Sequence, residues 1–176
     1  MVNLDEPAVA PEIEAQGPEW ARLKYHQCPH CPLSQLEHAF CPVALRISDL
    51  VKAFTELRSY EEIDVMVSMR ERSVCQTVTV QRLLCSLMGL MMATCGCPVT
   101  DFFRPMAENH LPFSTEAETM NRAISTYLTS QMLLSRQGED VDFSLNGLQE
   151  IYDDVHEMNY YVAQRLHYLE GSEPSR

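Results

Sequence analysis

A dense group of cysteines and histidines near the amino terminus constrains the fold of this chain more than any other feature. Three thiols and three imidazoles fall within sixteen residues: His26, Cys28, His30, Cys31, His38 and Cys41. The C-x2-C spacing of the first two thiols lets both sulfurs face one ion, at about 2.3 Å from zinc. We therefore expect a bound metal in this segment.

Three thiols need a fourth ligand to close a tetrahedral zinc site. His38 lies three residues before Cys41, a spacing that places both on one face of a helical turn. The first predicted ligand set is therefore Cys28, Cys31, His38 and Cys41. Cys97, at the end of a predicted helix, is the other candidate for the fourth ligand. Such a closed zinc site would be structural, and an iron–sulfur cluster is the less favoured occupant. Without a metal, the three cysteines would be small buried apolar side chains.

The charge of the chain argues against nucleic-acid binding. The net charge is −12 over 176 residues, and five acidic residues without any basic one fall within residues 1–19. An acidic surface offers no electrostatic attraction for a phosphate backbone. We therefore expect a protein or a small molecule as the partner.

The cysteine content and the length of the apolar segments predict the cellular compartment and whether the chain crosses a membrane. The chain starts without the basic and apolar segments of a signal peptide, and it has seven cysteines, an odd number. These features favour a reducing cytoplasm. The longest apolar stretch, residues 83–97, has fifteen residues. It is shorter than the ~20 residues needed to cross a bilayer, so we expect a buried helix and no membrane contact.

The periodicity of apolar residues predicts an α+β fold that is predominantly helical. Strands are expected at 21–26 and 63–69, and helices at 42–57, at 79–94, from Thr115 onward and from Ser144 onward. A small amino-terminal two-stranded element with the cysteine cluster would pack on a bundle of three or four helices. Residues 1–19 are expected to form a flexible acidic arm, 20–170 a single domain, and 171–176 a disordered tail.

Three local signals mark helix ends. Gly96 and Pro98 end the helix that begins near Thr79, and residues 98–114 read as a loop. Thr115 and Glu118 form a capping box for the next helix. The last helix has an apolar seam that needs a partner helix. That partner is expected within the chain, with homodimerisation as the less favoured alternative.

Other chemistry is conceivable for the same residues. Cys28-Pro-His-Cys31 matches the motif of a thiol oxidoreductase, in which Cys28 would be the nucleophile at a helix N-terminus. A metal-dependent enzyme could use an open zinc position beside His110. A soft-metal sensor could use the helical set Met88, Met91, Met92 and Cys95. For this last set a packed helix core is the favoured interpretation.

Several short motifs together resemble an uncharacterised bacterial family of unknown function. They are C-P-x-C followed by C-P-V-A, then G-C-P, R-P-M and H-L-P-F. The resemblance covers about residues 20–168, and it implies no activity and no site. In that family's pattern the position of Cys95 is more often serine, which makes Cys95 a poor candidate for a ligand. The function expected from the sequence is a metal-stabilised cytoplasmic binding or regulatory module, with zinc as the ion.

Overall fold

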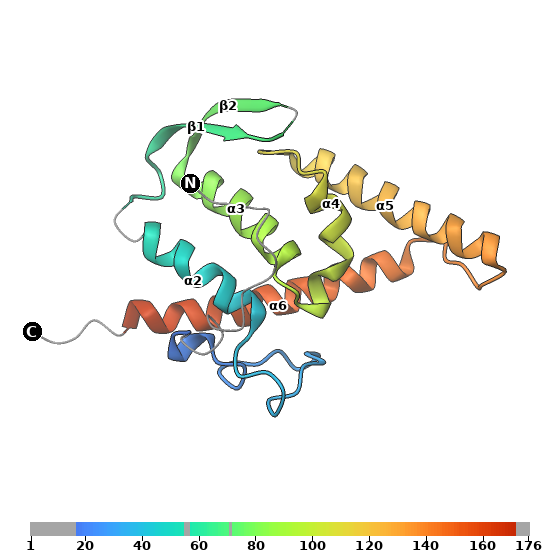
Figure 1. Cartoon of the computed structure of the whole chain (residues 1–176), viewed down its shortest axis with the longest axis horizontal. Helices are drawn as coiled ribbons and strands as arrows, with labels where there is room; N and C mark the ends of the chain where they lie inside the picture. Colours follow the sequence, from blue (N-terminus) through green and yellow to red (C-terminus); the bar gives the residue numbers. More distant parts are fainter. Residues whose placement is uncertain (1–16, 55–56, 71, 172–176) are drawn as a thin grey trace, which may run out of the picture.

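The structure, a computed structural model, describes residues 17–54, 57–70 and 72–171. Its elements follow in the order η1 (Glu19–Ala21), α2 (Pro42–Phe54), β1 (Glu62–Ser68), β2 (Ser73–Thr79), α3 (Val80–Thr94), η2 (Pro98–Phe103), α4 (Arg104–Glu108), α5 (Glu116–Gln137) and α6 (Asn146–Gly171). Helices thus dominate and the described sheet has two strands, which confirms the predicted α+β, mainly helical class. In Figure 1 the long helix α6 runs below α2 and α3, and the hairpin lies on the opposite side.

The two strands form an antiparallel hairpin. Ile63 pairs with Val78, and Val67 pairs with Val74. Every second residue of β1 is half-buried, and this face packs against a cluster that includes Leu83 of α3. The strand predicted at 63–69 is therefore confirmed. Its partner β2 is missing from the sequence prediction, because few of its seven residues are apolar and its outer face is polar.

The strand predicted at 21–26 is wrong. Residues 19–21 form a short 3-10 helix and residues 23–26 form turns, with only an isolated bridge between Arg22 and Phe40. Ala21 and Leu23 alternate with polar residues because they are buried in the main core, where they are 0% and 1% exposed. The cysteine segment is therefore separate from the two-stranded element, which lies between α2 and α3.

The predicted signals at the ends of α3 and at the start of α5 are used. The Thr79 hydroxyl accepts a hydrogen bond from the Arg82 N–H at the start of α3, and the chain leaves α3 through Gly96 at φ 82°. Thr115 and Glu118 form the capping box of α5. Residues 98–114, predicted as a loop, contain η2 and α4. Proline near the start of each explains this, since its fixed φ suits the first helical turn.

The last helix begins two residues later than predicted, and Asp142 rather than Ser144 organises its start. The Asp142 carboxylate accepts hydrogen bonds of 2.8 Å from the N–H groups of Ser144 and Gly147 and one of 2.9 Å from the Tyr127 hydroxyl. A Cβ at Gly147 would lie 2.4 Å from that hydroxyl oxygen, so any larger residue there would displace the Tyr127 side chain from this hydrogen bond. This connection fixes α6 against α5.

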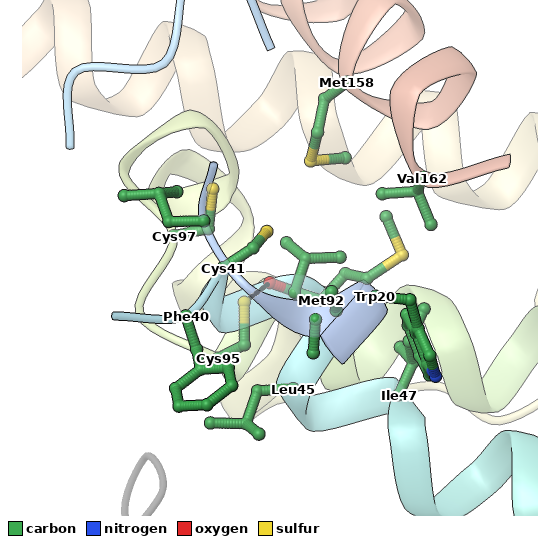
Figure 2. Packing of buried hydrophobic residues seen from close by; sticks show 14 residues of the cluster. Trp20, Phe40, Cys41, Leu45, Ile47, Met92, Cys95, Cys97, Met158 and Val162 are labelled. Atoms are coloured by element: carbon green, nitrogen blue, oxygen red, sulfur yellow. Dashed lines mark hydrogen bonds between the residues drawn. The ribbon is translucent and has the colours of Figure 1, made fainter. Parts of the chain in front are cut away.

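The main core joins the amino-terminal segment to three helices. Its buried members are Trp20, Ala21, Leu23, Phe40, Cys41, Val43, Ala44, Leu45, Ile47, Met92, Cys95, Cys97, Met158 and Val162. They come from η1, α2, α3, α6 and the segments between them (Figure 2). The apolar seam predicted for the last helix therefore finds its partners within the chain.

Two predicted boundaries fall mainly beyond the described residues. Of the predicted acidic arm at 1–19, residues 1–16 lie outside them, and of the predicted tail at 171–176, residues 172–176 do. Glu19 belongs to η1 and Gly171 ends α6.

Candidate metal centre

A long loop carries three of the predicted ligands, Cys28, Cys31 and His38. Its ends are joined by a hydrogen bond of 3.0 Å from the Leu23 N–H to the Ala39 carbonyl, and by one of 2.8 Å from the Cys41 N–H to the Ala21 carbonyl. The residues between contain no helix or strand. Irregular loops beyond roughly 12–15 residues are uncommon in compact domains and are usually functional. This loop therefore needs an additional source of order.

Cys28 and Cys31 flank a tight turn within this loop. The Cys31 N–H donates a hydrogen bond of 3.0 Å to the Cys28 carbonyl. Both side chains are half-buried and pack against the main core. The turn is what the C-x2-C spacing predicts, and it places both thiols beside the same part of the core.

Cys41 and Cys97 bring two further thiols to this place from distant parts of the chain. Cys41 directly precedes α2, and its carbonyl accepts a hydrogen bond from the Leu45 N–H. The helix N-terminus favours a negative charge there. Cys97 directly precedes η2, and Figure 2 shows the two residues side by side. They are 9% and 5% exposed, so both thiols are largely withdrawn from water.

The four thiols lie close enough to influence one another's ionisation. Burial raises the pKa of Cys28 to about 12, and Cys41, Cys31 and Cys97 add to the rise, opposed by Arg165. Burial also raises the pKa of Cys97, and Cys41 and Cys31 act on it in the same sense. The neighbouring thiols oppose the ionisation of Cys28 and Cys97 because like charges repel. Without a cation, Cys28 and Cys97 are therefore neutral at physiological pH.

The structure places the two candidates for the fourth ligand differently. Cys97 is among the groups that act on Cys28. His38 is half-buried in the loop, where its backbone N–H donates a hydrogen bond of 2.9 Å to the Ser34 carbonyl. The set brought together is thus Cys28, Cys31, Cys41 and Cys97.

A sequence signal distinguishes these four cysteines from the other three. Each of the four is followed directly by proline, whereas Cys75, Cys85 and Cys95 are followed by glutamine, serine and glycine. Proline restricts the preceding residue to extended backbone, so each of the four thiols is carried on a stiffened segment. This pattern would have selected Cys97 over His38 from the sequence alone.

A buried arginine lies beside the cluster. Arg165 of α6 is 1% exposed, and its guanidinium donates hydrogen bonds of 2.9, 2.8 and 3.3 Å to the carbonyls of Trp20, Arg22 and Leu23. Within residues 17–54, 57–70 and 72–171 no carboxylate forms a salt bridge with it. Burial lowers the pKa of Arg165, and the groups opposing this effect are the thiols of Cys41, Cys28 and Cys31, followed by the Tyr25 hydroxyl.

His30, inside the Cys28–Cys31 turn, connects the loop to α6. Its Nδ1 lies 2.7 Å from a carboxylate oxygen of Glu157, and its buried Nε2 has no hydrogen-bond partner among the described residues. A carboxylate on one ring nitrogen fixes the orientation of an imidazole and leaves the other nitrogen for a ligand. His30 thus anchors the turn and presents an unused acceptor or donor within it.

No described group of three or more His, Cys, Asp or Glu side chains stands in a geometry ready to hold a metal ion. A bound ion would therefore require the thiols to turn toward a common point.

The arrangement favours neither the thiol oxidoreductase nor the soft-metal sensor. In a thiol oxidoreductase of the expected kind the first thiol lies at a helix N-terminus, which lowers its pKa. Here irregular backbone follows Cys28 as far as α2, and its pKa is raised. In the proposed sensor set, the Cys95 thiol is buried and donates to the Met92 carbonyl, shown as a dashed line in Figure 2. Met91 and Met92 are buried, as expected for a helix core.

His110 lines a wall to which none of the clustered cysteines contributes. It lines a cavity of about 600 Å³ together with residues of α3, α4, α5 and α6. Burial and the neighbouring Arg122 lower its pKa. The cysteines of the cluster are not among the residues that line this cavity, so an open zinc position beside His110 finds no support in this arrangement.

No single described helix is long and apolar enough to cross a membrane. Val80–Thr94 and Pro98–Glu108 pass that test of length and composition only as a pair, and they are bent by 108°.

The fold and site define a small, mainly helical α+β domain with a four-cysteine cluster over a buried arginine. The chain belongs to the family described as Domain of unknown function (DUF6901), whose model matches residues 2–173. This confirms the resemblance to a family without assigned activity. Comparison with curated proteins and with solved structures found no match.

Proposed function

We propose that this chain is a zinc-stabilised binding module in which Cys28, Cys31, Cys41 and Cys97 hold the ion. The observation that carries the proposal is the burial of Arg165 beside these thiols without a carboxylate partner among the described residues. Buried charges in proteins are normally paired or coordinated to metals. A thiolate cluster would supply the missing negative charge.

Charge balance explains why the metal is needed for this pairing. The half-buried Cys28 and the buried Cys97 hold their protons in the metal-free form, since withdrawal from water disfavours their thiolates. A zinc ion deprotonates the thiols that coordinate it. Four thiolates and one Zn²⁺ carry a net charge of −2, which the guanidinium of Arg165 partly balances. Binding of the metal would thus convert neutral thiols into an anionic cluster, which would balance the charge of the buried Arg165 guanidinium.

The loop between Leu23 and Ala39 needs a source of stability that its own packing does not provide. It buries few large apolar side chains, and Leu36 in it is 98% exposed. A structural zinc site contributes about 10–16 kcal/mol in small metal-dependent domains. Four protein ligands leave no position for substrate, so the ion would stabilise the fold rather than catalyse. A module of this kind, with reduced thiols, would work in the cytoplasm.

The proposal is tested by counting metal per chain. Native mass spectrometry and elemental analysis of the full chain should give one zinc per chain. Cys97→Ser should lose the zinc, whereas His38→Ala and the matched control Cys85→Ser should retain it. Iron with sulfide would establish an iron–sulfur cluster in place of zinc. A metal-free wild-type chain that also takes up no zinc after reduction would overturn the proposal.

A further inference from the structure

A cavity among the helices is lined by none of the four clustered cysteines. It has a volume of about 600 Å³ and is walled by α3, η2, α4, residues 110–114, α5 and α6. Ligand pockets in proteins typically measure roughly 300–1,000 Å³. Its wall is largely apolar, with Met88, Leu90, Phe103, Met106, Leu111 and Val155 among its members. The size and the lining suit a small organic molecule.

The charge of the lining is opposite to that of the chain. Arg82, His110 and Arg122 line the cavity, and no aspartate or glutamate is among the described residues that do. The chain as a whole has 25 acidic and 13 basic residues. The two arginines are the described lining residues that carry a full charge at neutral pH, and in such an acidic chain they create a local site for an anion.

The two guanidinium groups retain free donors. Arg82 donates through Nη2 to the Phe113 carbonyl at 3.2 Å, and Arg122 donates through Nη2 to the carbonyls of Met106 and Asn109. In the described part of the chain, Nε and Nη1 of both side chains have no hydrogen-bond acceptor. Arg122 therefore caps α4 with one nitrogen and keeps others available. A guanidinium fork of this kind binds carboxylate or phosphate oxygens in pairs.

Gly89 exposes the backbone of α3 to the cavity because it has no side chain. It lies in the middle of that helix and lines the cavity, and a Cβ built on it would meet no atom within 4 Å. Glycine within a helix costs about 0.5–1 kcal/mol relative to alanine. No described part of the protein requires its small size. Close approach of a ligand to the helix backbone would explain it.

Phe113 adds strain at the same wall. It has φ 58°, in the left-handed region, and its side chain is 7% exposed. This conformation is a genuine outlier for a bulky residue, and such strain clusters at functional sites. The hydrogen bond from Arg82 holds the carbonyl of this residue. The strained residue and a basic side chain are thus coupled at the cavity.

We infer that the cavity binds an apolar molecule with one anionic head group, a carboxylate or a phosphate monoester. The head group would meet the free donors of Arg82 and Arg122, and the apolar part would lie along α3 past Gly89. The inference is independent of the metal at the cysteine cluster.

Four probes with the same ten-carbon chain test this inference by titration calorimetry of the full chain. They are decanoate, decyl phosphate, decanol and decyltrimethylammonium, each below its micelle concentration. At least one anion should bind at one per chain, about tenfold or more tighter than decanol and the cation, as expected from a charged hydrogen-bonded pair. Tighter binding of decanoate would assign a carboxylate ligand, and tighter binding of decyl phosphate would assign a phosphate monoester.

Two variants locate the binding site. Gly89→Leu should fill the cavity and abolish binding of the anion, while the matched control Ser125→Leu, at an exposed position of α5, should leave it unchanged. Arg82→Gln should lower the affinity for the anion by about tenfold and leave the affinity for decanol unchanged. Equal binding of anion and cation, absence of saturable binding, or wild-type affinity in Gly89→Leu would overturn the inference.

Discussion

The guanidinium of Arg165 donates a hydrogen bond of 2.9 Å to the main-chain carbonyl of Trp20, across 145 residues of sequence. With two further bonds to the carbonyls of Arg22 and Leu23, it ties the last helix to the entrance of the cysteine loop. The same cation faces the thiols, so structural and electrostatic roles meet in one side chain.

Two substitutions separate these roles of Arg165. Arg165→Lys keeps the charge but cannot reproduce the planar fork, and Arg165→Gln removes the charge. In the presence of a chelator, urea unfolding should show both variants destabilised by about 2–3 kcal/mol through lost hydrogen bonds. Arg165→Gln should in addition bind zinc about tenfold more weakly, measured by competition with a chromogenic chelator. Identical zinc affinity in the two variants and the wild type would exclude charge compensation.

Thiol accessibility provides a second test. Cys75 and Cys85 are exposed, whereas the four clustered thiols are half-buried or buried. In the zinc-bound chain, a thiol reagent at pH 8 should modify Cys75 and Cys85 rapidly, as identified by peptide mapping. After removal of zinc, Cys31 should follow because its thiol is half-buried, whereas the raised pKa of Cys28 keeps that thiol protonated and slows its reaction. Rapid modification of Cys28 with zinc present would contradict metal coordination.

The start of α6 should show a pH dependence caused by Asp142. Hydrogen bonds from the Ser144 hydroxyl and the Gly147 N–H lower the pKa of Asp142 from 3.8 to about 2. The folded state therefore holds this proton less readily than the unfolded state. The stabilisation is present above pH 3.8 and is lost as the pH falls through about 2. The difference in unfolding free energy between wild type and Asp142→Asn should shrink over that range, and a difference independent of pH would contradict the role of the ionised carboxylate.

Gly89→Ala should increase stability. The new methyl group meets no atom within 4 Å, so the variant gains helix propensity without a clash. The free energy of unfolding should rise by about 0.5–1 kcal/mol, measured in urea. A decrease would show that glycine is required by the protein itself, and would remove one argument for a ligand at this wall.

Local signals in the sequence predicted much of the fold. The capping box of Thr115 and Glu118 and the glycine after α3 depend on neighbouring residues only, so the sequence predicts them well. The alternation of apolar and polar residues at 21–26 gave a wrong strand prediction, because Ala21 and Leu23 are buried by packing against helices that are distant in the sequence. Strand β2 was not predicted because its outer face carries polar residues.

The candidate site was less accessible from sequence. Spacing predicts pairs such as Cys28 and Cys31, but the approach of Cys97 and Arg165 depends on how the helices pack. The R-P-M and H-L-P-F motifs contribute Met106, His110, Leu111 and Phe113 to the cavity wall, but the two arginines come from α3 and α5, and no motif in the sequence connects them. In the sequence, the Cys–Pro pairs mark the clustered cysteines and the mid-helix Gly89 marks the cavity wall. Both can be interpreted in this way only when the fold is known.

The most direct test of the central claim is zinc K-edge X-ray absorption on the purified full chain. The account predicts one zinc per chain surrounded by four sulfur atoms at about 2.3 Å. Replacement of one sulfur by a nitrogen at about 2.0–2.1 Å would contradict the assignment of Cys97 and favour a histidine such as His38. A shell of oxygen and nitrogen alone would contradict the cysteine site itself.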